Sequence, residues 1–301
     1  MNNQKNFSEE EKSNRINLAA CYHLADHFQM SDIIWNHITV RTSSEKNTFL
    51  INKFGLRYDE ITASNLLEID QDGTVVCGDG EINDTGYVIH GAIHKTREDI
   101  NCVMHTHSRA GLAISCLKNG LQPIIQDAAI FHNRVSYHDW QGMSTEVEEC
   151  ESLAKSLGSN KVMILRNHGL LTCGETIGEA FMLMYYLDRA CKNQVDTLSM
   201  GQDVIGPSDN IMEYAASQYD DPRFQLGKHE WPALLRLLDD NKSIYNQLHN
   251  LQGWKEKLLI TDSTNKQLNV QIHILLRMDH LFYISLSHRN NDCKNYNHLV
   301  D

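Results

Sequence analysis

The chain has 301 residues, of which 41% are hydrophobic and 22% charged, so it is long enough to bury a sizeable core and has the composition of a globular protein. Its formal net charge of −12 argues against nonspecific binding to nucleic acid or to an anionic membrane surface, because both are polyanions. The N-terminal segment MNNQKNFSEEEKSNR lacks the apolar region of a secretory signal, and no run approaches the roughly 18 apolar residues of a membrane span.

Eight cysteines are scattered singly along the chain, without a CxxC pair. In a chain of this length such spacing is typical of reduced thiols rather than of a disulfide framework. These features predict a cytoplasmic protein that binds neither nucleic acid nor membrane.

The first third of the chain alternates predicted helices and strands. Ser8 and Glu11 have the spacing of a capping box, which predicts a helix over 8–28. Runs rich in β-branched residues predict strands over 35–42 and 48–52. A helical turn and a strand hairpin around Asp72-Gly73 are expected next. A helix over 85–99 and a buried strand over 100–108 complete this part.

The alternation continues to about residue 200. The predicted elements are a helix over 109–118, a strand-rich stretch over 122–140, a helix over 146–158 and a buried strand over 161–169. A second capping box, at Thr176 and Glu179, predicts a long helix that reaches residue 198. Such alternation of helices and strands predicts a layered α/β/α domain.

The character of the sequence changes after residue 200. A loop is expected over 200–210 and a helix over 227–248, and strand-like runs follow at 258–262, 269–276 and 281–287. We therefore expect one large domain over 1–247 and a C-terminal extension over 248–301. The extension has the pattern of a small β appendage and carries no motif that indicates a function.

Three histidines follow short apolar runs and suggest a metal site. His105 and His107 lie two residues apart at the end of a predicted buried strand, so their side chains project to the same face. His168 follows a second such strand. Three imidazoles around zinc, with a fourth position open, are typical of a catalytic rather than a structural site. The alternative is a chance HxH pair, since the chain has 16 histidines.

A competing pair lies on the helix predicted over 85–99. His90 and His94 are four residues apart, in the frame of the zinc-binding HExxH motif, but Gly91 stands where that motif has its glutamate. His94 is therefore interpreted as a residue near the polar boundary of the helix, and His90 as a candidate for lining the pocket of the other histidines.

Several stretches resemble the class II aldolase/adducin family, most closely its adducin-type bacterial branch. They include "DIIWNHITVR", "GYVIHGAIHKTREDINCVMHTHSRAG" and "LRNHGLLTCGETIGEAF", and the resemblance covers about residues 10–245. It implies a three-layer α/β/α sandwich around a central β-sheet, assembled as a cyclic homotetramer. It also implies a divalent metal, most often zinc with iron as an alternative, on His105, His107 and His168. In the aldolases this ion polarises a ketose carbonyl and stabilises the enediolate.

The sequence departs from the aldolases at the residues that handle protons and phosphate. Gly86 stands where the aldolases have their acid/base glutamate, so the catalytic residue stays unassigned. Asp84 and Thr85 replace two phosphate-binding serines, and an anionic Asp84 would repel a phosphate group. A small, non-phosphorylated substrate is therefore expected.

Asn36 and Thr39 match the family's substrate-side loop. Together with Asp84, Thr85 and His90 they form the predicted substrate-binding set. The alternative role of Asn36 and Thr39 is to cap the backbone of that loop.

Three functions remain open at this point. The first is a metal-dependent lyase that acts on a small carbonyl or carboxylate compound, by aldol-type or decarboxylative chemistry. The second is a non-haem iron oxygenase that uses the same three histidines. The third is a non-catalytic, adducin-like oligomeric scaffold, which the missing glutamate favours. The retained histidines, and a C-terminal segment without a lysine-rich run, favour an enzyme.

Overall fold

The computed structural model describes residues 7–142, 147–238 and Tyr245, together with four short strands near the C-terminus. The chain divides into two compact units, Met1–Leu251 and Gln252–Asp301. The first unit contains both stretches that carry the predicted metal ligands.

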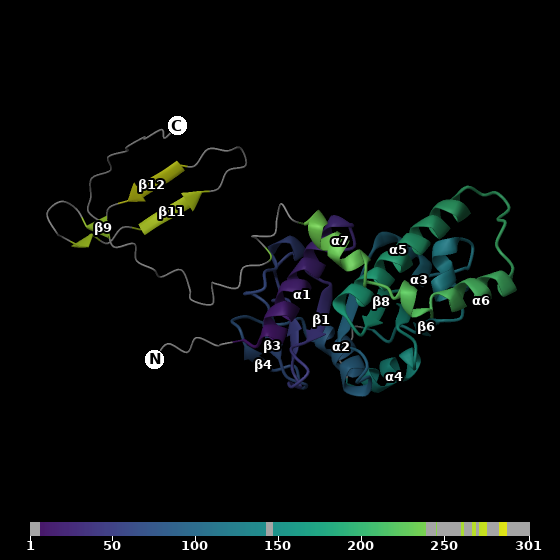
Figure 1. Ribbon diagram of the computed structural model, residues 1–301, viewed down its shortest axis with the longest axis horizontal. Coiled ribbons are helices and arrows are strands. Elements are labelled where there is room, and N and C mark those ends of the chain that lie inside the picture. The colour runs from purple at the N-terminus through teal and green to yellow at the C-terminus, as the bar shows by residue number, and fades with distance from the viewer. Residues whose placement is uncertain are drawn as a thin grey trace. The chain divides into compact units, whose positions relative to one another are not determined.

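An eight-stranded sheet forms the centre of the first unit, in the order β4-β3-β2-β1-β5-β8-β7-β6. Figure 1 labels β1, β3, β4, β6 and β8 of this sheet. The pairings are antiparallel except for β6 with β7. The strands are β1 (His37–Arg41), β2 (Phe49–Ile51), β3 (Leu67–Ile69), β4 (Val75–Cys77), β5 (Cys102–Thr106), β6 (Val135–His138), β7 (Val162–Leu165) and β8 (Gly169–Gly174).

Helices cover both faces of this sheet. Helices α1 (Glu9–His27) and α5 (Ile177–Ser199) pack their buried residues against Ile38, Met104 and Leu170 on one face. Helices α2 (Asp84–Thr96) and α4 (Val147–Leu157) pack against Val103 and Leu171 on the other. The predicted three-layer α/β/α sandwich is confirmed.

Shorter helices complete the unit. They are α3 (Arg109–Ser115), α6 (Asp209–Gln218) and α7 (Glu230–Leu237), with 3₁₀ turns at η1 (Tyr58–Glu60), η2 (Gln126–Phe131) and η3 (Pro222–Phe224).

Two helices begin at the caps that the sequence predicts. The Ser8 hydroxyl accepts a hydrogen bond from the Glu11 amide at 3.1 Å, and the Thr176 hydroxyl accepts one from the Glu179 amide at 3.0 Å. Each bond satisfies an amide that has no partner within its helix, so the start of each helix is fixed by its own sequence.

Three sequence-based expectations were wrong in part. The stretch 122–140 was expected to be rich in strand, but it contains η2 and only one strand, β6. Helix α6 begins at Asp209, where only the end of a loop was expected. The strand predicted over 161–169 ends at Leu165, because Asn167 adopts a left-handed conformation (φ 58°) and turns the chain into β8.

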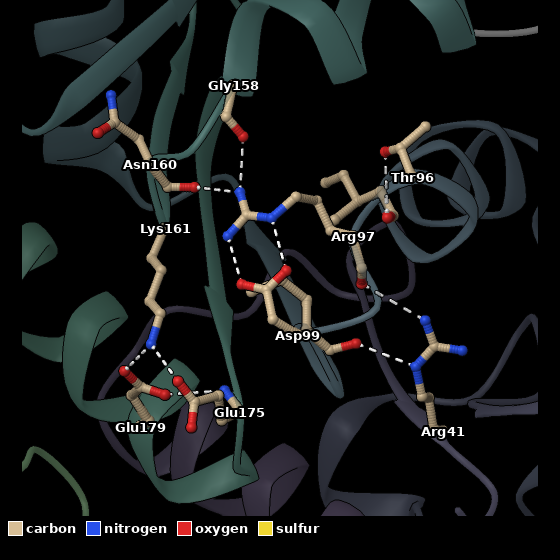
Figure 2. A network of polar contacts seen from close by, with 11 residues as sticks. Arg41, Thr96, Arg97, Asp99, Gly158, Asn160, Lys161, Glu175 and Glu179 are labelled. Carbon is tan, nitrogen blue, oxygen red and sulfur yellow. Dashed lines mark hydrogen bonds and ion pairs between the residues drawn. The ribbon is translucent and has the colours of Figure 1, made fainter.

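Two arginines attach the C-terminal end of α2 to the rest of the domain (Figure 2). Arg41 Nη2, at the end of β1, donates to the His94 carbonyl at 2.7 Å. The Arg97 guanidinium donates two hydrogen bonds to the Asp99 carboxylate, at 2.8 and 2.7 Å, and one to the Gly158 carbonyl. The hydrogen bonds from Arg97 lower the pKa of Asp99. These contacts fix where α2, which carries His90 and His94, lies on the sheet.

The described residues of the C-terminal unit form two antiparallel strand pairs. Strand β9 (Ile260–Thr261) pairs with β10 (Gln267–Leu268), and β11 (Gln271–Leu275) pairs with β12 (Tyr283–Ser287). The helix predicted over 227–248 is described over Glu230–Leu237, and apart from Tyr245 the remainder of that prediction from residue 239 lies outside the described residues. Among the described helices, none combines the length and the hydropathy that crossing a bilayer requires.

Candidate metal centre

The three predicted ligands meet at one end of the central sheet. His105 lies near the end of β5, His107 follows that strand, and His168 lies in the turn between β7 and β8. A nitrogen atom from each ring can be chosen so that all three lie within 4.8 Å of one another. The ring centroids are 4.7 to 5.0 Å apart. Because β5 and β8 run antiparallel, the C-terminal end of one lies beside the start of the other, and this brings His168 to the pair.

The hydrogen bonds of two of these histidines determine where their protons lie. His105 Nδ1 lies 2.9 Å from the Leu170 carbonyl oxygen, and His107 Nδ1 lies 2.9 Å from Asp32 Oδ2. A carbonyl and an ionised carboxylate can only accept, so both Nδ1 atoms carry the proton. In a neutral imidazole the Nε2 atom is then a free acceptor.

These two Nε2 atoms lie only 2.9 Å apart. With both rings neutral, two lone pairs face each other at that distance, and a cation bound between them would remove their repulsion. The nitrogens of a tetrahedral zinc site, with bonds of roughly 2.0–2.1 Å, lie about 3.3 Å apart, which is close to the spacing found here. The donor set therefore fits a divalent metal.

Burial keeps two of these ligands neutral, His105 and His168. It lowers the pKa of His105 well below its usual range and lowers the pKa of His168 to about 4, and the neighbouring imidazoles act in the same direction. A metal binds only the unprotonated form of histidine, so the two rings are ready to coordinate at neutral pH.

Gly169 allows the turn that carries His168 to approach β5. A Cβ atom at this position would lie 2.5 Å from the Thr106 carbonyl oxygen and 3.1 Å from Cδ2 of His107. No side chain fits there, so the glycine is a requirement of the site's geometry.

A fourth histidine, His37, lies beside the triad. It is the register partner of His105 on β1, and the two ring centroids are 5.2 Å apart. Its Nδ1 atom lies 2.8 Å from His90 Nε2. A Cβ atom at Gly86 would lie 2.8 Å from this ring. The His37 ring thus occupies the space next to the position where the aldolases have a glutamate.

The predicted substrate-binding residues fall into three groups. Asn36 Oδ1 accepts from the His107 amide at 3.3 Å, and its buried Nδ2 has no hydrogen-bond partner among the described residues. The Thr39 hydroxyl lies 2.7 Å from His90 Nδ1, and both side chains are buried. Asp84 and Thr85 form the first turn of α2, and their side chains lie outside the described part of the structure.

The interpretation of His94 as a polar-boundary residue was wrong. Its ring is 2% exposed, stacks on Phe49 with centroids 4.4 Å apart, and lies 2.8 Å from the Thr39 hydroxyl. Sequence reasoning also missed Asp32 and His37. The period of β1 could have shown His37, because residues two apart on a strand share a face and His37 precedes Thr39 by two.

Comparisons with known proteins agree with this architecture. The family described as the class II aldolase and adducin N-terminal domain matches residues 16–195. The structure of an aldolase II superfamily protein from Pseudomonas syringae is 40% identical, with a TM-score of 0.75, over 79% of this chain and 97% of that one.

Two further relatives differ in their described roles. An L-fuculose 1-phosphate aldolase from Glaciozyma antarctica is 26% identical, with a TM-score of 0.70, over 81% of this chain and 96% of that one. Alpha-adducin of Rattus norvegicus is 39% identical over 254 residues, which cover 78% of this chain and 34% of the adducin.

Proposed function

Because the chain belongs to the class II aldolase and adducin family, we propose that it is a metal-dependent lyase for a small, non-phosphorylated carbonyl or carboxylate compound. Its reaction would be an aldol-type or decarboxylative cleavage. The observation that carries this proposal is that one ring nitrogen from each of His105, His107 and His168 lies within 4.8 Å of the others, with the Nε2 atoms of His105 and His107 2.9 Å apart. Three imidazoles that converge in this way at a partly buried site present the donor set that a zinc ion takes.

In this proposal His105, His107 and His168 hold the ion, and zinc is the ion that three neutral imidazoles suit best. When bound, the metal supplies a Lewis acid that polarises a carbonyl group of the substrate. The Leu170 carbonyl and the Asp32 carboxylate keep two of the ligands in the correct tautomer. The buried Nδ2 of Asn36 is a donor that an oxygen atom of the substrate can satisfy.

The sequence at the start of α2 disfavours a phosphorylated substrate. One relative is named for a sugar phosphate, but this chain has Asp84 at the start of the helix. A carboxylate at this position would repel a phosphate group, which favours a non-phosphorylated substrate.

A second candidate function is an adducin-like scaffold without catalytic activity. The 39% identity to alpha-adducin and the glycine at position 86 favour it. The two functions differ in the role of the three histidines. A lyase turns over a substrate at the metal that they bind, whereas a scaffold has no catalytic activity there.

We further propose that the chain forms a homo-oligomer, a tetramer as the family resemblance implies. Large apolar side chains lie exposed near site residues. Ile33 (68% exposed) and Trp35 (50%) lie close in sequence to Asn36, and Trp140 (57%) lines a small pocket together with His168. Their burial against another copy of the chain would remove apolar area from water. Native mass spectrometry of the full chain tests this, and a monomer at micromolar concentration would contradict it.

The catalytic proposal is tested with the full-length protein, loaded with zinc or with ferrous iron, on a panel of short hydroxy-keto acids. We expect carbon–carbon cleavage by the zinc form, loss of activity in His107→Ala, and unchanged activity in His229→Ala, whose side chain is exposed. Iron-dependent oxygen consumption would favour the oxygenase. A metal-loaded protein with no turnover on the panel would favour the scaffold.

A further inference from the structure

A cavity of about 530 Å³ lies at the end of the central sheet that is opposite the metal centre. Its wall includes Arg41, the last residue of β1, and Asn101, which precedes β5. The metal ligand His105 lies near the other end of β5 and is the register partner of His37, the first residue of β1. The cavity is therefore separate from the triad, and its volume falls within the roughly 300–1,000 Å³ of pockets that bind small organic molecules.

The segment 225–232, which leads into α7, contributes part of the wall and is fixed to α1 and α5. The Trp231 indole donates through Nε1 to Asn17 Oδ1 at 2.9 Å. A Cβ atom at Gly227 would collide with the backbone of Gly178, so these two backbones are in direct contact. Close packing thus holds this wall in place, and the cavity is formed before any ligand arrives.

Two cationic side chains of the wall retain free donors. Arg41 donates through Nε to the Ile100 carbonyl at 3.1 Å and through Nη2 to the His94 carbonyl at 2.7 Å. Figure 2 shows its remaining nitrogen without a contact to the residues drawn. The exposed Lys228 forms neither a hydrogen bond nor an ion pair with any described residue. Among the described carboxylates, none lies within ion-pair distance of either cation, and Glu98 acts on Arg41 only at longer range.

The two acidic residues of the wall, in contrast, are already engaged. Glu10 accepts hydrogen bonds from the amide and the hydroxyl of Ser44, at 2.9 and 3.0 Å. Glu175 forms an ion pair with Lys161 at 3.0 Å. The hydrogen-bonding capacity that remains at the cavity is therefore that of the two cations. An anion complements such donors, because hydrogen bonds between charged partners are roughly twice as strong as those between neutral ones.

Apolar side chains also line the cavity, among them Val40, Leu226 and the ring of Trp231. An inorganic ion would leave this apolar surface in water, whereas an organic anion covers it. We propose that the cavity is a second ligand site, which binds a small organic acid with an apolar body. The carboxylate of the acid contacts Arg41, and Lys228 adds a second positive charge at the wall. The inference does not depend on the proposed function.

The test compares three probes, benzoate, benzamide and acetate, on the full chain in the presence of a chelator, with binding followed by ligand-observed NMR. Benzamide has the shape of benzoate without its charge, and acetate has the charge without the ring. We expect benzoate to bind with a Kd of about 1 mM or tighter, which is within reach of a ligand of this size. Benzamide and acetate should each bind at least roughly tenfold more weakly, because each lacks one of the two interactions.

Lys228→Glu reverses one charge of the cavity wall without breaking a contact within the described part of the chain. We expect it to weaken benzoate binding roughly 2–30-fold, twice the free energy of an exposed ion pair, and to leave benzamide unaffected. Lys118→Glu is the matched control. It changes the net charge of the chain by the same amount at an exposed lysine that does not line the cavity, so benzoate binding should stay close to that of the wild type.

Two further variants locate the bound probe. Arg41→Gln should weaken benzoate binding by at least roughly tenfold, the effect of a hydrogen bond to a charged group. If Arg41→Gln does not fold, the comparison of Lys228→Glu with Lys118→Glu decides alone. His107→Ala should bind benzoate as the wild type does, because the triad lies at the other end of the sheet.

Three results would overturn the inference. The first is no benzoate binding by the wild type up to about 10 mM, which is weaker than a site of this kind predicts. The second is equal affinity for benzoate and benzamide. The third is equal benzoate affinity in Lys228→Glu and Lys118→Glu together with loss of binding in His107→Ala, since the probe would then occupy the triad.

Discussion

The Asp32 carboxylate accepts a hydrogen bond from His107 Nδ1, and the Leu170 carbonyl accepts one from His105 Nδ1. Each acceptor fixes the proton on Nδ1, so that the Nε2 atom of the same ring can bind a metal. The carboxylate belongs to the loop before β1, where Ile33 adopts a left-handed conformation (φ 50°) that β-branched residues rarely take. The loop therefore stores backbone strain beside the site, as is common where a side chain must be aimed.

Removal of the Asp32 carboxylate should weaken the metal site without destroying it. We expect Asp32→Ala to lower the affinity for zinc about 10–100-fold, because His107 loses the group that fixes its tautomer and orientation. Competition with a chromogenic chelator measures this affinity. Asp59→Ala is the matched control, because Asp59 forms an exposed ion pair with Arg57 and lies outside the site. Equal affinities in the two variants would contradict the role of Asp32.

At the scale of residues, the sequence predicts the metal ligands better than the residues that hydrogen-bond to them. His105 and His107 share a face by strand period alone, and the apolar run before His168 indicates a second strand. Asp32 could not be found in this way, because its position depends on an irregular loop whose path no local pattern encodes. The partners of His90 and His94 also require tertiary contacts with β1.

At the scale of elements, three alternate residues of β1 form hydrogen bonds with α2. His37 contacts His90, Thr39 contacts both His90 and His94, and Arg41 contacts the His94 carbonyl. All three β1 residues lie two apart and so face the same helix. Gly86 allows the contact between His37 and His90, because the His37 ring occupies the space into which a side chain at position 86 would project.

This contact predicts coupling between positions 37 and 86. We expect Gly86→Ala to destabilise the wild type by about 1–3 kcal/mol, because the new methyl group overpacks the ring. In a His37→Ala background the same substitution should cost much less. Urea unfolding of the wild type, the two single variants and the double variant forms a double-mutant cycle. Additive effects would mean that the two residues do not compete for the same space.

The elements themselves were predictable where local signals are strong. The capping boxes gave the starts of α1 and α5, and the helical spacing of apolar residues gave α2. The stretch around η2 was mistaken for strand because a short apolar run has no period that separates a strand from a helical turn. The sheet's antiparallel pairing also could not be deduced, because alternating helices and strands usually indicate parallel strands.

At the scale of the whole molecule, the buried histidines predict sensitivity to acid. Burial lowers the pKa of His94 to about 3 and that of His168 to about 4, against about 6.5 in an unfolded chain. Above pH 6.5 both states are neutral at these residues. Below it only the unfolded chain takes up the protons, so the free energy of unfolding of the metal-free protein should fall as the pH drops from 6.5 towards 4.

Each such histidine contributes up to about 1.4 kcal/mol per pH unit to this fall. We expect His94→Gln, which can keep a bond to Thr39, to reduce the slope by about this amount between pH 6 and 4. His229→Ala should leave the slope unchanged, because His229 is exposed. Urea titrations at several pH values, in the presence of a chelator, measure it. An unchanged slope in His94→Gln would mean that this ring is already protonated in the folded protein.

The central claim is that the three histidines hold one divalent ion, and the most direct measurement is a zinc titration of the chelator-treated full chain followed by calorimetry. We predict one zinc per chain for the wild type and for His229→Ala. We predict no stoichiometric binding for His105→Ala, His107→Ala or His168→Ala. Wild-type protein that binds no zinc, or triad variants that bind it as tightly as the wild type, would contradict the account.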